Sequence, residues 1–434
     1  MTVKKKFNKR TKIIAGVIAA AVIGFSIYTI NGIVVNTNLS LTSYVPGGHY
    51  PQYPALNLKG KTKEQVVEIN RGEYLVKVGD CLACHTNVAN GGKPYSGGLP
   101  MQTPFGSLYS PNITPDKETG IGGWSEKDFM RAVHDGVNPR GQFYYPAFPY
   151  IFFNKLKTED VTAIKAYLDV VPAVNQQNRQ NEMMFPFNWR FLQLAWRILF
   201  FYPERTGAYQ DNAAESTQWN RGAYLVEGLG HCAMCHTPSY YLLNKNVSLG
   251  APIRKYNYTG AVIEGYLAPN ISKSNIGAVP DAQLLDVFRK YSMIGGNPVQ
   301  GPMADAIHDS LIHLTTADLL AMITYLKTVD SEVVVQPKAE STKVGKVIYE
   351  NYCSACHNAG IGGAPRISND LGWEKLANSG LEKLYDVAIH GGGNMPAKGT
   401  CITCSDYQIR LAVDYMVSQS RKANKPVKYV PVKK

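Results

Sequence analysis

The chain contains three copies of the pattern Cys-x-x-Cys-His, at residues 81–85, 232–236 and 353–357. Two thiols one helical turn apart can each add across a vinyl group of haem, and the imidazole that follows can bind the iron from the proximal side. The pattern therefore predicts three covalently bound haem c groups. The predicted tethers are Cys81, Cys84, Cys232, Cys235, Cys353 and Cys356, and the predicted proximal ligands are His85, His236 and His357.

Other uses of a Cys-x-x-Cys pair fit this chain less well. Zinc sites usually combine two half-sites at a short, regular separation, whereas these copies lie more than a hundred residues apart. A thioredoxin-like motif would need a single pair beside a βαβ pattern. Structural disulfides would not explain a histidine after every second cysteine.

The N-terminal segment is typical of a membrane anchor. Residues 13–35 carry no charge and follow six basic residues, and this length can span a bilayer as a helix. The flanking lysines favour a cytoplasmic N-terminus. We therefore expect a single-pass protein of the bacterial inner membrane with its haem domains in the periplasm, an oxidising compartment. A cleaved signal peptide is the alternative, since it shares the basic start.

The net charge of +12 is uneven along the chain, because basic residues cluster before residue 13 and again after residue 420. A charge excess confined to the two ends does not favour a nucleic-acid-binding surface on the folded part. We therefore expect no nucleic-acid partner.

An internal repeat organises the rest of the chain. Arg-Gly-Glu-Tyr-Leu-Val at 71–76 precedes the first motif and Arg-Gly-Ala-Tyr-Leu-Val at 221–226 precedes the second, while the third has a shorter counterpart at 345–349. Pro-Asn-Ile at 111–113 recurs at 269–271. Each unit ends in apolar residues at helical spacing. These patterns predict an all-α fold of three tandem domains, each wrapped around one haem.

The predicted boundaries follow the repeat and the composition of the segments between its copies. They are a basic tail and anchor at 1–35, a stalk at 36–60, domain one at 61–172, a connector at 173–215, domain two at 216–330, a linker at 331–342, domain three at 343–421 and a basic tail at 422–434. The connector is rich in Trp, Phe and Leu between residues 183 and 202. It is either an amphipathic helix that packs between domains or one that faces the membrane interface or another subunit.

The sixth iron position is predicted to hold a methionine. A Met thioether there raises the reduction potential and suits electron transfer, whereas a vacant position suits gas or peroxide chemistry. In domain three Met395 follows a run of three glycines that lets the backbone approach the haem. In domain two Met303 is the predicted ligand, with Met293 and His308 as alternatives.

Domain one lacks a methionine at the corresponding place, which Phe148 takes. Met101, in a loop rich in glycine and proline, is the preferred ligand there over Met130 and His134. The alternative role for Met101 is packing on the proximal side of the haem.

Two further cysteines, Cys401 and Cys404, have no histidine after them and do not form a fourth attachment site. They lie between Met395 and the last predicted helix. A short-loop disulfide that stiffens the Met-bearing segment is favoured over free thiols or a metal site.

The first two domains resemble the triheme cytochrome c subunit of membrane-bound bacterial dehydrogenases of the alcohol, aldehyde and gluconate types. The resemblance rests on the segment 221–232, Arg-Gly-Ala-Tyr-Leu-Val-Glu-Gly-Leu-Gly-His-Cys, and on 110–122, which begins Ser-Pro-Asn-Ile-Thr-Pro-Asp, and it covers roughly residues 60–330. It implies tandem class I cytochrome c domains behind an N-terminal transmembrane helix. It also implies a quinoprotein, flavoprotein or molybdenum dehydrogenase as partner and ubiquinone or an oxidase as acceptor.

The third domain departs from that family and resembles the short cytochromes c of the c-five type. Its matching segments are 353–365, 395–399 and 401–406. This second resemblance implies that Cys401 and Cys404 are joined in a disulfide. It also leaves open whether electrons leave to a quinone or to another cytochrome or oxidase.

The sequence predicts an electron-transfer subunit without catalysis of its own. Its glycine runs lack the strand–turn–helix context of a dinucleotide site, and no nucleophile–base pattern is present. The expected function is therefore a membrane-anchored periplasmic relay from a dehydrogenase subunit to ubiquinone or a downstream oxidase. The alternatives are a stand-alone quinol or cytochrome electron carrier, and a haem enzyme that uses an open sixth position in domain one.

Overall fold

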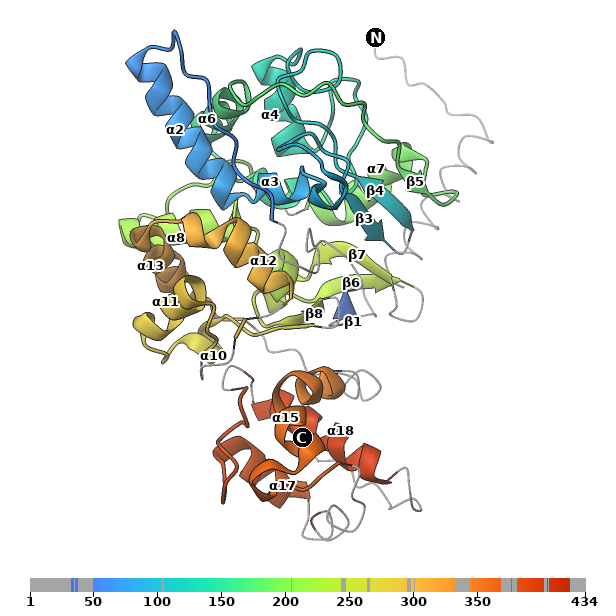
Figure 1. The fold of residues 1–434 in the computed structure, drawn as a ribbon, viewed down its shortest axis with the longest axis vertical. Helices are drawn as coiled ribbons and strands as arrows, with labels where there is room; N and C mark the ends of the chain where they lie inside the picture. The colour runs from blue at the N-terminus through green and yellow to red at the C-terminus, as the bar shows by residue number, and fades with distance from the viewer. Residues whose placement is uncertain are drawn as a thin grey trace, which may run out of the picture.

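The computed structural model describes most of the chain between residues 50 and 421 (Figure 1). The described ranges are 33–34, 36–37, 50–103, 105–203, 205–242, 247–263, 266–294, 298–299, 301–331, 344–367, 376, 381–401, 404 and 406–421. The predicted basic tails, nearly all of the predicted anchor and all but the first residue of the linker lie outside these ranges. Within them, no helix is both long enough and apolar enough to cross a bilayer.

Helices surround each Cys-x-x-Cys-His motif, and we refer to these groups as the first, second and third unit. The first unit contains α2 (Lys63–Val78), α3 (Cys81–Cys84), α4 (Glu126–Asp135), α5 (Tyr150–Phe153) and α6 (Thr158–Leu168). The second contains α8 (Thr217–Glu227), α9 (Ala233–His236), α10 (Lys273–Ile276), α11 (Asp281–Lys290), α12 (Pro302–Asp309) and α13 (Thr316–Leu326). The third contains η6 (Tyr349–Cys353), α15 (Ser354–Ala359), α17 (Leu381–His390) and α18 (Asp406–Arg421).

The first helix of each of the first two units begins at a polar cap and ends just before the cysteines. Thr62 and Gln65 form a capping box at the start of α2, and Ser216 caps α8 through the N–H of Trp219. Such caps satisfy backbone N–H groups that the first turn leaves unpaired. The cysteine motifs then follow within a few residues of the helix ends.

The first and last helices of each unit cross at a glycine. A Cβ atom on Gly72 of α2 would lie 1.9 Å from the carbonyl oxygen of Ala163 in α6, and one on Gly222 of α8 would lie 1.9 Å from that of Ala321 in α13. In the third unit, Gly345 stands 2.1 Å by the same measure from the carbonyl of Leu411 in α18. The recurring glycine of the repeat is therefore a contact point between two helix backbones.

The prediction of an all-α fold is too narrow, because the loops after the first two motifs contain short strands. The described strands form three sheets, in the orders β3–β4–β5, β1–β6–β7 and β2–β8–β9. Their bounds are β1 Ile33–Val34, β2 Asn36–Thr37, β3 Pro100–Thr103, β4 Gly106–Tyr109, β5 Glu182–Met183, β6 Ser239–Leu242, β7 Val247–Pro252, β8 Ala261–Ile263 and β9 Tyr266–Ala268. Hairpin pairing satisfies backbone groups of long loops that have no helix partner.

The end of the predicted anchor helix is also corrected. Ile33 and Val34 form strand β1, which pairs with Tyr240 and Ser239 of β6 in the antiparallel sense. β-Branched residues favour strands over helices when a partner strand is available.

The connector packs against both of the first two units. It forms η2 (Arg190–Leu192), α7 (Gln193–Trp196) and η3 (Arg197–Phe201). The indole N–H of Trp196 donates to the Leu249 carbonyl at 2.7 Å, and the buried guanidinium of Arg197 donates to the Asp135 carbonyl at 2.6 Å. The connector therefore joins the second unit to the first.

The outer face of the connector is apolar and exposed. The exposed residues are Met184, Phe185, Trp189, Phe191, Leu194, Ile198 and Tyr202.

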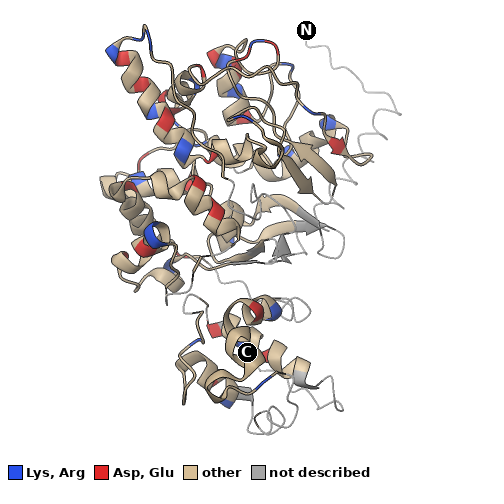
Figure 2. Cartoon of the chain, viewed as in Figure 1, with Lys and Arg blue, Asp and Glu red and all other residues tan. Residues whose placement is uncertain are grey.

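Charged residues of both signs are interspersed over the helices of the first two units in the view of Figure 2.

The buried apolar residues of the first two units form one core, and those of the third unit form another, which also includes Ala261 of β8. Reciprocal polar contacts join the first two. The hydroxyl of Tyr74 in α2 donates to Asp318 in α13 at 2.6 Å, and that of Tyr224 in α8 donates to Asp160 in α6 at 2.5 Å.

An arginine from the same unit holds each of these carboxylates. Arg71 pairs with Asp160 at 2.6 Å, and Arg221 pairs with Asp318 at 2.8 Å. The Arg-Gly-x-Tyr part of the repeat therefore has a structural meaning: the arginine holds the aspartate of its own unit, and the tyrosine reaches the aspartate of the other unit.

Replacing Gly222 tests the close crossing of α8 and α13. In a free helix Gly→Ala would stabilise by about 1 kcal/mol, but Gly222→Ala places a methyl group against the Ala321 carbonyl. Overpacking of this kind costs about 1–3 kcal/mol or more, so we expect a lower melting temperature by calorimetry. Gly123→Ala is the control, since its nearest atom would lie at 3.6 Å. Equal melting temperatures for both variants would contradict the close crossing.

The Asp318 carboxylate, at the interface of the first two units, predicts that the stability of the fold depends on pH. Burial alone would raise the pKa of Asp318, but hydrogen bonds from Arg221 and Tyr74 outweigh burial and lower that pKa. A carboxyl with a lowered folded-state pKa stabilises the fold above its unfolded pKa, and this stabilisation is lost as the pH falls through the folded pKa. We therefore expect the free energy of unfolding to decrease as the pH is lowered below about 4. In Asp318→Asn this decrease should be smaller.

Denaturant unfolding at a series of pH values measures both effects. Asp211→Asn is the control, because this carboxylate is 63% exposed and lies 3.5 Å from its lysine partner. A pH dependence that is the same in Asp318→Asn and in the unchanged protein would refute the assignment.

Candidate functional site

In the first two units the Cys-x-x-Cys-His motif forms a helical turn within a few residues of the end of a longer helix, and in the third unit it runs from the end of η6 into α15. In the first unit the N–H of His85 donates to the Cys81 carbonyl at 3.0 Å, and in the second that of His236 donates to the Cys232 carbonyl at 2.9 Å. Residues three apart on a helix share a face, so each turn presents its two thiols together. None of the six motif cysteines forms a disulfide in the structure.

The proximal histidines are held in the same way in all three units. Nδ1 lies 2.8 Å from the Pro111 carbonyl in His85, 2.8 Å from the Pro269 carbonyl in His236 and 2.9 Å from the Pro365 carbonyl in His357. A carbonyl oxygen only accepts, so Nδ1 carries the proton and Nε2 keeps its lone pair. Metal-binding histidines are commonly oriented by such a second hydrogen bond.

In the first and second units, the threonine that follows the motif histidine accepts a hydrogen bond from a tyrosine N–H in the next loop. Thr86 accepts from the N–H of Tyr95 at 3.2 Å, and Thr237 accepts from that of Tyr258 at 2.9 Å. Both tyrosines are fully buried and have positive φ, 63° and 62°.

An asparagine turn holds the proline carbonyl beside each of these histidines. The side chain of Asn112 accepts from the N–H of Thr114 at 2.9 Å, and that of Asn270 accepts from the N–H of Ser272 at 2.8 Å. Asparagine commonly forms such turns with the backbone two residues on.

Burial sets the protonation state of the motif side chains. It lowers the pKa of His85 and of His236, which keeps both imidazoles neutral. It raises the pKa of the Cys81 and Cys232 thiols to about 12. Neutral imidazole is the form that binds a metal, and burial disfavours free thiolates at these positions.

This donor set fits haem c. Each turn supplies two cysteines outside disulfides for thioether bonds and one imidazole whose Nδ1 is bonded to a proline carbonyl, so Nε2 is the nitrogen that would bind iron. We infer that the residues that would hold the group are the predicted tethers and proximal histidines. No described group of three or more His, Cys, Asp or Glu side chains forms a separate metal site.

The predicted sixth ligands lie on different kinds of element. Met303 is the second residue of α12 and packs against the shared core, half-buried. Met395 is half-buried in a loop, bridged by backbone hydrogen bonds to Gly392. Met101 lies in β3 opposite Leu108 of β4. Their assignment as ligands stays a prediction.

The second unit's alternative ligands, His308 and Met293, have contacts of their own. Nδ1 of His308 lies 2.9 Å from the Asp309 carboxylate, and its ring stacks on Tyr50. The sulfur of Met293 accepts a hydrogen bond from the Tyr352 hydroxyl.

An aromatic cluster occupies the segment of the first unit that corresponds to the methionine-bearing segments of the other two. Phe148 lies edge-on to Tyr144 and to Phe153, with ring centroids 5.5 and 5.6 Å apart. Met130 and His134, which are less favoured candidates for this ligand than Met101, lie on α4, and Met130 packs against the shared core.

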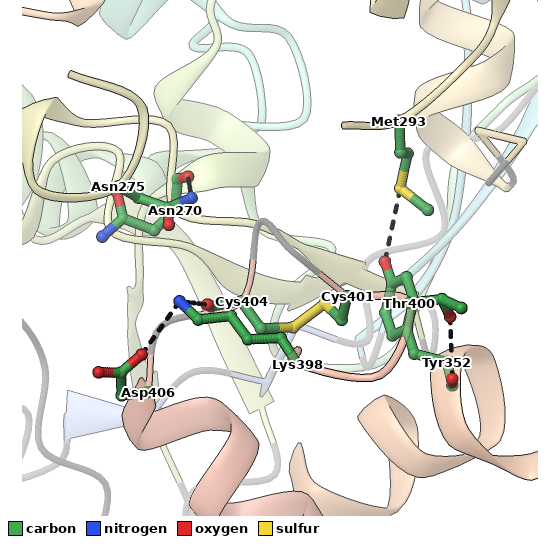
Figure 3. Close-up of a disulfide and its surroundings, with 9 residues drawn as sticks. All are labelled: Asn270, Asn275, Met293, Tyr352, Lys398, Thr400, Cys401, Cys404 and Asp406. Atoms are coloured by element: carbon green, nitrogen blue, oxygen red, sulfur yellow. Dashed lines mark hydrogen bonds and ion pairs between the residues drawn. A yellow bond between two sulfur atoms is a disulfide. The ribbon is translucent and has the colours of Figure 1, made fainter. Parts of the chain in front are cut away.

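A disulfide joins Cys401 and Cys404 in the third unit (Figure 3). The ammonium group of Lys398 donates to the Cys404 carbonyl at 2.9 Å and pairs with Asp406 at 3.0 Å. These bonds tie the loop after Met395 to the start of α18.

The proline carbonyls are functional groups that the sequence analysis did not identify. The recurrence of Pro-Asn-Ile at 111–113 and 269–271 was the available signal, but nothing in it tells which backbone oxygen faces a histidine. Pro365 has no such asparagine after it, so its role has no counterpart in sequence.

Removal of the asparagine turn tests this arrangement. Asn112 is buried and its amide also donates to the Val174 carbonyl at 2.7 Å. Losing one partner of a buried hydrogen bond costs about 1–3 kcal/mol, so we expect Asn112→Ala to lower the melting temperature and to change the visible absorption of one haem. Asn175→Ala is the control because this residue is exposed. An unchanged spectrum in Asn112→Ala would argue against the turn holding the histidine.

Comparison with known proteins agrees with this chemistry. Residues 340–416 match the family model described as cytochrome C oxidase, cbb3-type, subunit III. A shorter similarity is to cytochrome c5 of Ectopseudomonas mendocina, with 42% identity over 71 residues, 16% of this chain and 82% of that protein.

Longer similarities cover most of the chain. A nicotinate dehydrogenase subunit of Pseudomonas putida is 36% identical over 340 residues, 74% of this chain but only 27% of that protein. The gluconate 2-dehydrogenase cytochrome c subunit of Pantoea cypripedii is 37% identical over 307 residues, 67% of this chain and 68% of that protein. The chain therefore belongs to the family of cytochrome c subunits of bacterial dehydrogenases, in which haem c is covalently bound.

Proposed function

We propose that this chain is a membrane-anchored, periplasmic triheme cytochrome c that relays electrons from a dehydrogenase catalytic subunit to ubiquinone or a downstream oxidase. Its architecture would be three tandem class I cytochrome c domains behind an N-terminal transmembrane helix. One observation carries the proposal. The same donor set, two cysteines outside disulfides and an imidazole held through Nδ1 by a proline carbonyl, occurs three times.

The residues divide the work of such a relay. The cysteines would tether the group, the proline carbonyls hold each imidazole through Nδ1 so that Nε2 would bind the iron, and burial keeps His85 and His236 neutral. Met303, Met395 and, in the first unit, Met101 are the proposed sixth ligands. Bound at these sites, haem c supplies reversible one-electron chemistry of iron.

Dehydrogenase relatives support the proposed partner. Two of the similar proteins carry the names of a gluconate and a nicotinate dehydrogenase subunit. The match spans only 27% of the nicotinate dehydrogenase subunit, and we expect the catalytic part of such a complex to come from another polypeptide. The chain is also similar to a short cytochrome, cytochrome c5 of Ectopseudomonas mendocina. With the resemblance of residues 343–421 to that type, this keeps a protein acceptor as the alternative to a quinone.

The proposed membrane location rests on two features. Residues 13–35 form an uncharged run behind a basic N-terminus. The connector carries an exposed aromatic and aliphatic face, and Trp, Tyr and Phe favour the boundary between headgroups and acyl chains.

The number of haem groups is the decisive test. The intact mass of the mature protein should exceed that of the polypeptide by three haems, because each thioether link survives denaturation. The double variant Cys81→Ala/Cys84→Ala should lose one haem, and the corresponding variants of the other two motifs should each lose one as well. Cys401→Ala/Cys404→Ala is the matched control and should keep all three. A wild-type protein with fewer than three haems would sink the proposal.

A further inference from the structure

The second and third units meet at a side-chain hydrogen bond next to a haem attachment site. The hydroxyl of Tyr352 donates to the sulfur of Met293 at 3.6 Å (Figure 3). Tyr352 directly precedes Cys353, the first tether of the third unit. Met293 follows α11 and packs against the core that the first two units share. The bond thus links the core of one body to the attachment turn of the next.

The third unit holds Tyr352 firmly at this place. The hydroxyl of Thr400 donates to the Tyr352 carbonyl at 2.9 Å, and Thr400 adjoins the Cys401–Cys404 disulfide (Figure 3). Tyr352 therefore lies between the attachment turn and the loop that follows Met395. Burial raises the pKa of Tyr352 to about 12, so its hydroxyl keeps its proton and acts as a donor to sulfur.

A second contact brings the site of the second unit to the same boundary. Ala261 of β8 is fully buried and belongs to the apolar cluster of the third unit. Its neighbour Gly260 donates its N–H to the carbonyl of the proximal His236 at 2.8 Å. The loop that frames the second haem site is therefore in contact with the core of the third unit.

We propose that electrons pass between the second and third units at the Met293–Tyr352 contact, so that the second unit lies between the other two in the path of the electrons. This inference rests on the proposed function. The step moves one electron from the reduced site of one unit to the oxidised site of the other, so one site is oxidised and the other reduced by one electron. No atom or proton is transferred, and Tyr352 and Met293 act as positioning residues that keep their own oxidation state.

The middle place of the second unit follows from its two interfaces. Tyr74 and Tyr224 lock it to the first unit through the reciprocal aspartates, within one common core. Tyr352 and Ala261 bring it against the third unit.

The experiment measures electron redistribution in the full holoprotein. One electron is injected by a laser flash, and haem absorbance follows its movement among the sites. We expect Tyr352→Phe and Met293→Leu each to slow the redistribution several-fold, with unchanged midpoint potentials. If both residues act through one contact, the double variant is no slower than the slower single variant, since effects within one interaction are not additive.

Tyr349→Phe is the matched control. Tyr349 lies one turn before the attachment site, and its hydroxyl donates to Asn358 inside the third unit. Loss of this hydrogen bond should leave the rate of electron redistribution unchanged. The charge-transfer band of Met-ligated ferric haem is recorded for every variant and should be retained in Met293→Leu.

Three results would overturn the inference: wild-type rates in both single variants, an equal slowing in Tyr349→Phe, or loss of a methionine-ligand band in Met293→Leu. The last would make Met293 an iron ligand rather than a contact residue. Failure of the proposed function is seen separately, as a haem count below three. Three haems with unchanged rates refute only the electron path.

Discussion

The close crossing of the first and last helix is the constraint on which each unit depends. Two backbones touch at Gly72 and Ala163, at Gly222 and Ala321, and in the third unit at Gly345. The crossing fixes the end of the first helix, and the cysteine turn begins only a few residues further on. A side chain at the crossing would separate the helices and shift the thiols relative to the proline carbonyl that holds the histidine. The position of every haem donor therefore follows from one backbone contact.

The first helix of each unit also carries the residues that determine which units form an interface. In the first two units the crossing glycine is preceded by arginine and followed two residues later by tyrosine, and these side chains build the reciprocal aspartate contacts. In the third unit the corresponding residues are Val344 and Val347, which cannot form them. The third unit instead has a core of its own and meets the second through Tyr352. Gln408 also stands where the first two units have the aspartate, three residues before the crossing contact, so all three groups of this interface are missing from the third unit.

Much of the site could be predicted from sequence because its chemistry is local. Cysteines three residues apart followed by histidine specify a turn, and the structure keeps all three turns. The β-hairpins were missed because their strands are two to six residues long and lie in loops rich in glycine and proline. The proline carbonyls were missed because a backbone oxygen has no sequence signature. The Tyr–Asp contacts join residues more than two hundred or more than sixty positions apart, which periodicity cannot reveal.

The exchanged tyrosines have a consequence for how such a chain can be divided. Asp160 is 2% exposed and receives one of its donors from the second unit, and Asp318 receives one of its donors from the first. Separating these two units would leave each carboxylate with the arginine of its own unit but without its tyrosine donor. The amino-terminal pair therefore completes its hydrogen bonds only as a pair, whereas the carboxy-terminal unit forms those of Tyr349 and Tyr385 within itself.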